Sequence, residues 1–434
     1  MLLERMMFAS QLRVFRPRGL RSRGCLLIAV SIVACPSWAD GLSLADAERI
    51  ALDQAPSLKA VAARQVAIEQ RAVAAGELPD PMLKAGFMSL PTDTFHLGQE
   101  PMTQVQVGIV QKFPRGSSRA LRAEQMQERS AALGQVALDE RLRLRLAVTE
   151  EYIEIIRQRK LAEINVEARS AFTELEDITR GYYATGKVQQ QDVLRSAVEL
   201  ARVEDRATRI AQEEDRARAR LEAWIGEHAW REIEPGWPEF DPPTAPEAMH
   251  QALEQHPRIA ALNEQARAAD TAVELADQRY KPEFGIDLTY GARGGTHPDG
   301  RDRSDLLSVM LMMDLPLFSG NRQDRLKAAA VSESSAAMYQ RDDAWRKMRS
   351  EARMQWSVLQ RQAERLQRFE RSLLPDARDN AESALSAYQA ALGDLTTLMR
   401  ARINEYDLQL QYVDLHAERL KTLARLRYLQ GESS

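Results

Sequence analysis

The stretch EFGIDLTYGAR, residues 283–293, alternates strictly between apolar side chains and polar or small ones. Its apolar members are Phe284, Ile286, Leu288, Tyr290 and Ala292. The positions between them carry Glu283, Gly285, Asp287, Thr289 and Arg293. Alternation with a period of two predicts a β-strand that has one apolar face and one polar face.

Three other segments repeat this pattern, two of them strongly. TQVQVGIVQKF, residues 103–113, sets Gln104, Gln106 and Lys112 against apolar partners, and SDLLSVMLMMDLPLF, residues 304–318, places Val309 on its apolar face. PMLKAGFMSL, residues 81–90, follows the pattern more weakly. We therefore predict two β-hairpins, at about 82–113 and about 283–318, with strands about as long as tilted transmembrane strands.

The chain also repeats itself. ALDQAPSL at 51–58 returns as ALEQHPRI at 252–259, and the alignment continues to Tyr183 and Tyr388. A register kept over most of both halves indicates duplication. We predict repeats at 40–240 and 241–434, with the extra residues of the second in the glycine-rich loop GARGGTHPDGRDRS, residues 291–304.

Each repeat is predicted to begin with a helix, at about 44–75 and 246–278, and to end in very long helices. No proline occurs between Pro114 and Pro235, so residues 117–180 could form a helix about 95 Å long. The segment RLRLRLAV alternates like a strand, but its flanks favour helix. Apolar residues such as Ile153 and Ile155 lie on two neighbouring stripes, which predicts partners on two sides. The mixed charges are interpreted as solvated helix faces.

The first 39 residues resemble an export signal. Arginines precede the apolar run CLLIAVSIVAC, residues 25–35, and PSWAD follows with Ser37 and Ala39 at the small-residue positions of a cleavage site. Both cysteines, Cys25 and Cys35, lie in this segment, so the mature chain has neither a disulfide nor a thiolate metal site. A second interpretation has Cys35 acylated as the mature N-terminus.

Composition and motifs exclude several classes of function. The net charge of -4 and the pI of about 6.0 argue against nucleic-acid binding. The sequence has no phosphate loop, no G-x-S-x-G and no H-E-x-x-H, and its six histidines show no ligand spacing. We predict no enzyme activity, no cofactor and no metal site. Met310 and Met312 share the polar face of their strand, where thioethers would suit monovalent copper or silver; packing is the competing explanation.

Four strands cannot close a barrel alone, and lipid does not tolerate an open sheet edge. The hairpins therefore form either a soluble sheet or a barrel shared among subunits. The export signal and the long helices favour the shared barrel. The predicted fold class is mainly α with a transmembrane β-barrel contribution, built from a duplicated helix–β-hairpin–long-helix unit.

These features together resemble the TolC-type outer-membrane efflux family over nearly all of the mature chain. The motifs that match are LPDPML, VGIVQKFPRGSSRALRAE, DLPLFSGNRQDRLKAA, YYATGKVQQQDVLRSAVEL and AYQAALGDLTTLMRARINEYDLQLQYV. The forms PDPML and QKFP look most like the heavy-metal efflux branch, the CzcC and CusC type.

The resemblance implies a homotrimer whose strands form one barrel in the lipid of the outer membrane, continued by a helical tunnel in the periplasm. It implies a passive exit duct without a cofactor, which docks onto a periplasmic adaptor protein and an inner-membrane RND-type pump. The lumen would be lined by the polar strand residues Gln104, Gln106, Lys112, Glu283, Asp287 and Arg293.

The resemblance also places an aperture where the paired long helices turn, near Gly186 and Gly393. Tyr388 matches a tyrosine of the family's second turn, but Thr397 and Arg400 stand where the family has acidic residues. Asp192 and Asp394 could supply the carboxylates instead. The alternatives are that both aspartates cap helices and that Tyr388 only packs. Ala391 stands where the family often has glycine.

Two other functions remain open at this point. One is a periplasmic coiled-coil scaffold or adaptor without a barrel. The other is a TolC-like duct for drugs or secreted proteins, since a duct does not encode its cargo where a pump selects it.

Overall fold

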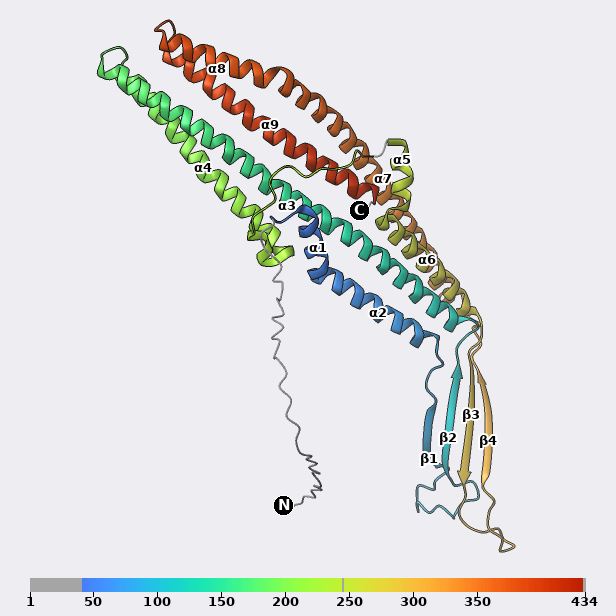
Figure 1. Ribbon diagram of the computed structural model, residues 1–434. Helices are drawn as coiled ribbons and strands as arrows, with labels where there is room; N and C mark the ends of the chain where they lie inside the picture. The colour runs from blue at the N-terminus through green and yellow to red at the C-terminus, as the bar shows by residue number, and fades with distance from the viewer. Residues whose placement is uncertain (1–40, 244–245, 432–434) are drawn as a thin grey trace, which may run out of the picture. The chain divides into compact units, whose positions relative to one another are not determined.

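The computed structural model describes residues 41–243 and 246–431. The predicted signal peptide, with Cys35, lies outside these residues. The first half contains α1 (Leu44–Gln54), α2 (Pro56–Gly76), β1 (Met82–Met88), β2 (Gln104–Phe113), α3 (Ser118–Ala184), α4 (Gln190–Ile225) and the 3-10 turn η1 (Gly226–Trp230) (Figure 1).

The second half repeats this order of elements. It contains α5 (Pro246–Gln255), α6 (Pro257–Asp277), η2 (Gln278–Tyr280), β3 (Phe284–Ala292), β4 (Leu306–Met313), α7 (Gln323–Arg368), the π-helical turn η3 (Phe369–Leu373), α8 (Leu374–Gln389) and α9 (Leu395–Gln430). The turn η3 lies next to Pro375, which has no N–H to give to the helical ladder.

The first helix of each half differs from the prediction, because each is two helices. Pro56 and Pro257 occupy the first turn of α2 and α6, where a fixed φ and a missing N–H cost nothing. The buried His256 before Pro257 accepts the N–H of Arg258 at 3.2 Å and so caps α6. The histidine therefore has a structural role.

The extra residues of the second half also lie elsewhere than predicted. The connection between β3 and β4, residues 293–305, is no longer than the one between β1 and β2, residues 89–103. The longer segment is the one between β4 and α7, residues 314–322, compared with 114–117 between β2 and α3. The glycine-rich sequence thus marked a loop, but not the site of the insertion.

The four strands form one antiparallel sheet in the order β1-β2-β3-β4. Leu288 on β3 lies opposite Ile109 on β2 and Val309 on β4, so the apolar positions of neighbouring strands share one face, as predicted. β1 and β4 are the edges, and the sheet of this single chain is open. Within the described residues, no helix combines the length and apolar character needed to cross a membrane.

The long helix α3 has the two-sided packing that its two stripes predict. RLRLRLAV lies within its 67 residues and is helical. Ile155 packs in a core with residues of α1 and α4, whereas Ile153 packs against Ala417 and Leu420 of α9. Both isoleucines are fully buried. One helix thus joins the two halves of the chain.

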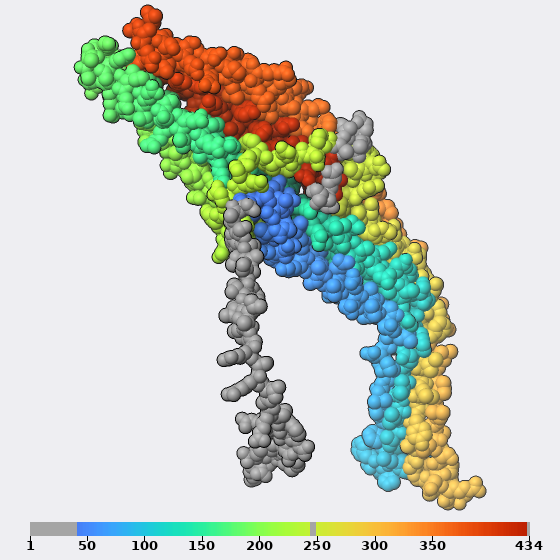
Figure 2. Space-filling view, in the orientation of Figure 1, coloured from blue at the N-terminus to red at the C-terminus, as the bar shows by residue number. Residues whose placement is uncertain are grey.

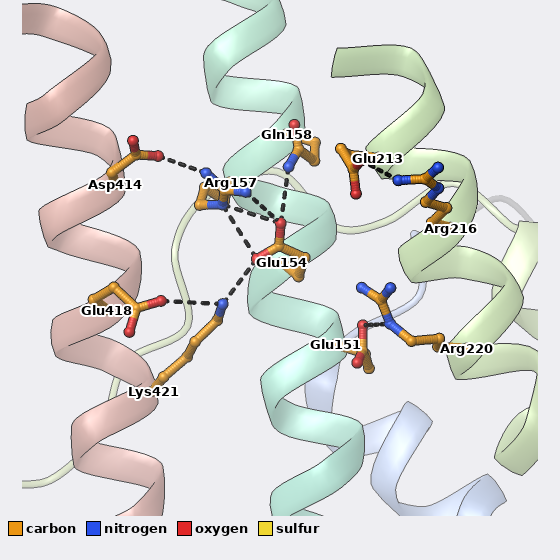
Figure 3. A network of polar contacts seen from close by, with 10 residues as sticks. All are labelled: Glu151, Glu154, Arg157, Gln158, Glu213, Arg216, Arg220, Asp414, Glu418 and Lys421. Atoms are coloured by element: carbon orange, nitrogen blue, oxygen red, sulfur yellow. Dashed lines mark hydrogen bonds and ion pairs between the residues drawn. The ribbon is translucent and has the colours of Figure 1, made fainter. Parts of the chain in front are cut away.

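A network of polar contacts also joins α3 to α9, as Figure 3 shows. The carboxylate of Glu154 accepts hydrogen bonds from Arg157, from Gln158 at 2.8 Å and from Lys421 of α9 at 2.8 Å. Arg157 reaches Asp414 of α9 at 2.6 Å. The side chains of Glu154 and Lys421 are only 12% and 14% exposed. Here the interpretation of the charges as a solvated face was wrong, because the partners come from the other half.

The contacts around Glu154 set its acidity. Burial by itself raises the pKa of this carboxyl, but the hydrogen bonds from Arg157, Lys421 and Gln158 outweigh burial and lower the pKa to about 2 from an ordinary 4.5. A carboxyl with a depressed pKa stabilises the folded state fully above its unfolded pKa. This contribution is lost as the pH falls from 4.5 toward 2.

We predict that Glu154→Gln lowers the free energy of unfolding by about 2 kcal/mol at neutral pH, because it leaves the shielded cations Arg157 and Lys421 short of a counter-charge. The matched control is Glu163→Gln in the exposed pair with Lys160, which should cost less than about 1 kcal/mol. Thermal unfolding of both variants measures the difference.

The pH dependence of the free energy of unfolding provides a second test of the role of Glu154. Between pH 4.5 and 2, the wild type should lose more stability than Glu154→Gln, because the variant has no carboxyl to protonate at this position. Parallel stability curves for the two proteins in that range would show that the network does not act through the charge of Glu154.

Candidate conduit wall and aperture

The two faces of the sheet differ in chemistry and in exposure. On β3, Asp287 and Thr289 are only 7% and 4% exposed, while Leu288 between them is 47% exposed. The exposed face continues with Val107 and Val309, which are 50% and 70% exposed. A soluble sheet buries its apolar face, so this arrangement is reversed and suits contact with lipid.

An ion pair crosses the polar face. Lys84 of β1 reaches over β2 to Asp287 of β3, which also accepts the hydroxyl hydrogen of Thr289 at 2.6 Å. The crossing depends on Gly108 of β2. A Cβ at this position would lie 2.5 Å from Oγ1 of Thr289 and 2.8 Å from Cε of Lys84. The glycine thus leaves room for a charged pair that ties together strands from both halves.

The sheet brings together four of the six predicted lumen residues. Gln104, Gln106, Lys112 and Asp287 share the polar face. Glu283 and Arg293 lie just beyond the two ends of β3. Arg293 donates to the carbonyl of Ser304 at 2.6 Å and so fastens the β3–β4 connection.

Lys84 of this face was missed by sequence reasoning, and Thr289 was placed on the polar face but not among the lumen residues. Lys84 and Thr289 belong to the polar row that includes Gly108. The signal was present, because Lys84 alternates with the apolar Leu83 and Ala85. The reach of Lys84 across a strand could not be seen without the register.

Polar contacts fix the junction between the sheet and the helices. Arg115, just after β2, pairs with Asp314, just after β4, and donates to the carbonyl of Arg279 at 3.0 Å. Asp314 also accepts the backbone N–H of Glu283. The segment that leaves the first hairpin is therefore tied to the segments that enter and leave the second.

At the opposite ends of the long helices, the chain makes two equivalent turns. α3 turns into α4 through residues 185–189, and α8 turns into α9 through residues 390–394. Gly186 has a φ of +70°, and the aligned Ala391 has a φ of +59°. Glycine adopts this left-handed conformation freely, but alanine is strained in it. The second turn therefore stores strain that the first does not.

Both candidate aspartates are helix caps in this structure. Asp394 accepts the N–H of Thr397 at 2.9 Å and its hydroxyl hydrogen at 2.8 Å, and these bonds lower the pKa of the aspartate. Asp192 accepts the N–H of Gln189 at 3.2 Å in a capping box. The capping alternative thus holds in the single chain. A carboxyl group at each turn is also what an aperture would use.

The other two aperture candidates lie in different surroundings. Tyr388 is 4% exposed and packs against Tyr182 with ring centroids 5.6 Å apart, and burial raises its pKa. Arg400 is exposed and forms no ion pair or hydrogen bond with any residue that the structure describes. Its counterpart Arg195 donates to the hydroxyl of Thr396 at 2.6 Å, which links the two turns.

The second half of the chain matches the model of a known protein family. Residues 248–432 match the family model described as outer membrane efflux protein. This description names an efflux protein, in agreement with the prediction that the chain is not an enzyme. No curated protein sequence is similar enough to count as a match.

Solved structures share the fold over most of the chain. The outer membrane protein VceC of Vibrio cholerae is 18% identical with a TM-score of 0.77, covering 90% of this chain and 96% of its own. A membrane protein from Pseudomonas aeruginosa is 15% identical, with a TM-score of 0.78 and coverages of 89% and 92%. CusC is 12% identical, with a TM-score of 0.76 and coverages of 90% and 92%. These likenesses show a common fold.

We predict that Asp394→Ala, which removes the cap, destabilises α9 by about 1 kcal/mol, whereas Asp394→Asn keeps an acceptor and costs less. If the charge restricts an aperture, both variants should admit more of a large antibiotic. Growth inhibition by that antibiotic separates the two roles. If Asp394 acts only as a cap, Asp394→Asn should have the antibiotic sensitivity of the wild type, and only Asp394→Ala should differ from it.

The first turn provides the same comparison. Asp192→Asn should reproduce the permeability of Asp394→Asn if carboxylates of both turns act together, and the double variant should exceed either one. Wild-type permeability in all three asparagine variants would contradict a role of the charges.

The aligned turn positions give a further prediction. Ala391→Gly should stabilise the second turn by about 1 kcal/mol, and Gly186→Ala should destabilise the first by a similar amount, because only glycine adopts the left-handed conformation without strain. Hydrogen exchange of the turn amides measures both changes. Faster exchange in Ala391→Gly would contradict stored strain.

Proposed function

We propose that this chain is the outer-membrane exit duct of a tripartite efflux pump and that it conducts substrate passively from the periplasm to the outside. The observation that carries the proposal is the distribution of exposure over the sheet: the apolar face is exposed on all four strands, while Asp287 and Thr289 at the centre of the polar face are buried. A wall between lipid and water needs this distribution.

The open edges call for further copies of the chain. Hydrocarbon provides no partner for the free N–H and C=O groups of β1 and β4, so a sheet in lipid has to close. The proposed closure joins β4 of one copy to β1 of the next. Three chains with four strands each then form one barrel, and the assembly is a homotrimer.

The long helices would continue the wall into the periplasm. The two turns, with Asp192 and Asp394, would then form the end farthest from the outer membrane, where the periplasmic adaptor and an inner-membrane RND-type pump dock. Residues 1–39 would direct export as a signal peptide. Cys35 would carry lipid in the alternative in which it becomes the N-terminus.

The two alternatives are not supported equally. A periplasmic scaffold without a barrel does not account for the exposed apolar face, and the matching family model is that of outer membrane efflux proteins. The choice of cargo is less constrained, since CusC is 12% identical and VceC 18%. We propose heavy-metal ions as cargo on the strength of the PDPML and QKFP motifs. Drugs are the alternative.

Substitutions at two neighbouring residues of β4 test whether the apolar face of the sheet contacts lipid. Val309→Arg places a charge on the apolar face at a cost of about 2 to 4 kcal/mol near the middle of the bilayer, so trimers in the outer membrane should be lost. Ser308→Arg places the same charge on the polar face and should leave assembly intact. The amount of trimer in outer-membrane fractions measures both variants.

Leu288→Arg on β3 should behave as Val309→Arg does, since the two residues lie opposite each other. Normal trimer levels in both arginine variants would contradict a lipid-facing wall and favour a soluble sheet.

The cargo is tested by deleting the gene and measuring growth on zinc, cobalt, cadmium, copper and silver salts beside dyes and antibiotics. We expect sensitivity to metals alone. Sensitivity to organic compounds alone would keep the duct and remove the metal assignment.

A further inference from the structure

A groove of about 630 Å³ lies between α5 and α7, far from the sheet and from the turns. We call it the α5–α7 groove. The helix α5 lies at the surface of the molecule (Figure 2). The floor of the groove is apolar, because the side chains of Met249, Leu253 and Ala352 are buried there, and the half-buried Trp356 forms part of its wall. Its volume and apolar floor are typical of sites for small molecules.

Two arginines of α7 line the groove, and neither has an acidic partner among the described residues. Arg349 lies over the ring of Trp345, 5.2 Å from its centroid, and this contact holds the guanidinium in place. Arg353 is exposed and forms no ion pair or hydrogen bond with any residue that the structure describes. Among the described lining residues the only carboxylate is that of Glu254, which lies 3.7 Å from Nδ1 of His250. The groove thus places a net positive charge beside an apolar floor.

The first half of the chain shows that the fold does not require these arginines. Residues 323–389 match 118–184 without a gap, so Arg349 and Arg353 stand where the first half has Leu144 and Val148. Both of these apolar side chains are buried in a core that α3 shares with α1 and α4. The open, charged groove is therefore specific to the second half, and the packing of the repeat does not explain it.

The groove would stay open in the proposed trimer. Val358 is the counterpart of Ile153, through which α3 packs on α9 of the other half. By the same relation, α7 would contact the next copy of the chain at Val358, which is exposed in the single chain. Arg353 lies about 140° around the helix from Val358, so the groove and that contact occupy different sides of α7.

The position of the groove along α7 limits the source of a ligand. Arg349 lies about 40 Å along the helix from Gln323, the end of α7 that leads to the sheet. If the sheet lies in the bilayer, as proposed above, a membrane lipid does not reach the groove. The ligand is therefore a molecule dissolved in water.

We propose that the α5–α7 groove binds a small amphipathic anion, a molecule with an apolar ring system and a carboxylate or sulfonate group. The rings lie on the apolar floor beside Trp356. The anionic group accepts hydrogen bonds from Arg349 and Arg353, because planar guanidinium groups suit such anions. This inference goes beyond the proposed function, since the groove involves neither the sheet nor the turns.

The test uses the full-length protein in phosphatidylcholine nanodiscs, with its assembly checked by size-exclusion chromatography. Equilibrium dialysis measures the binding of naphthalene-1-sulfonate, and 1-naphthol provides the same rings without the charge. Binding to empty nanodiscs is subtracted. We expect the sulfonate to bind about tenfold more tightly than naphthol, because its charge pairs with two arginines. Equal affinities would overturn the recognition of an anion.

Substitutions locate the site. Arg349→Gln combined with Arg353→Gln should lower the affinity for the sulfonate by about tenfold and leave naphthol binding unchanged. Arg346→Gln changes an exposed arginine of α7 that does not line the groove, and this matched control should bind as the wild type does. Trp356→Leu should weaken the binding of both probes by about threefold or more, because it removes an aromatic ring that both contact. An assembled double variant that binds the sulfonate as tightly as the wild type overturns the site and leaves the duct standing.

Discussion

The unpaired edges of β1 and β4 are the constraint on which the rest of the structure depends. An isolated four-stranded sheet with one apolar face is unstable both in water and in lipid. Water disfavours the exposed apolar side chains, and lipid disfavours the unpaired N–H and C=O groups of the edge strands. In the proposed duct, the alternation along β3 and the crossing of Lys84 over Gly108 would serve a wall that other copies of the chain complete. The exposed apolar residues of the single chain would then face lipid in that assembly.

The second organising element is the way in which the two halves hold each other. Duplication supplied two similar units, but the contacts between them are not symmetric. Glu154 of α3 takes its partner Lys421 from α9, and Arg115 takes Asp314 from the second hairpin. Such contacts fix the halves in one relative register, because a buried charge that loses its partner is costly. The chain therefore behaves as one unit rather than two linked repeats.

Much of the fold could be predicted from periodicity. Alternation in residues 283–293 fixed both the strand and its faces, and the proline-free segment before Pro235 predicted α3. Contacts between distant residues could not be predicted. Glu154 and Lys421 look like ordinary surface charges in sequence, and the distinction between cap and gate at Asp394 depends on backbone geometry. The break at Pro56 was visible, because proline favours the first turn of a helix, but the predicted helix ran through it.

The π-helical turn η3 makes the long helical path of the second half differ in stiffness from α3 in the first half. α3 runs without interruption from the junction near the sheet to its turn, whereas the corresponding path in the second half is broken into α7 and α8 at Phe369–Leu373. A wider turn with weaker hydrogen bonding is where a helix bends most easily. One helical arm of each chain is therefore continuous, whereas the other contains a turn at which it bends more easily, although the two halves have the same order of elements.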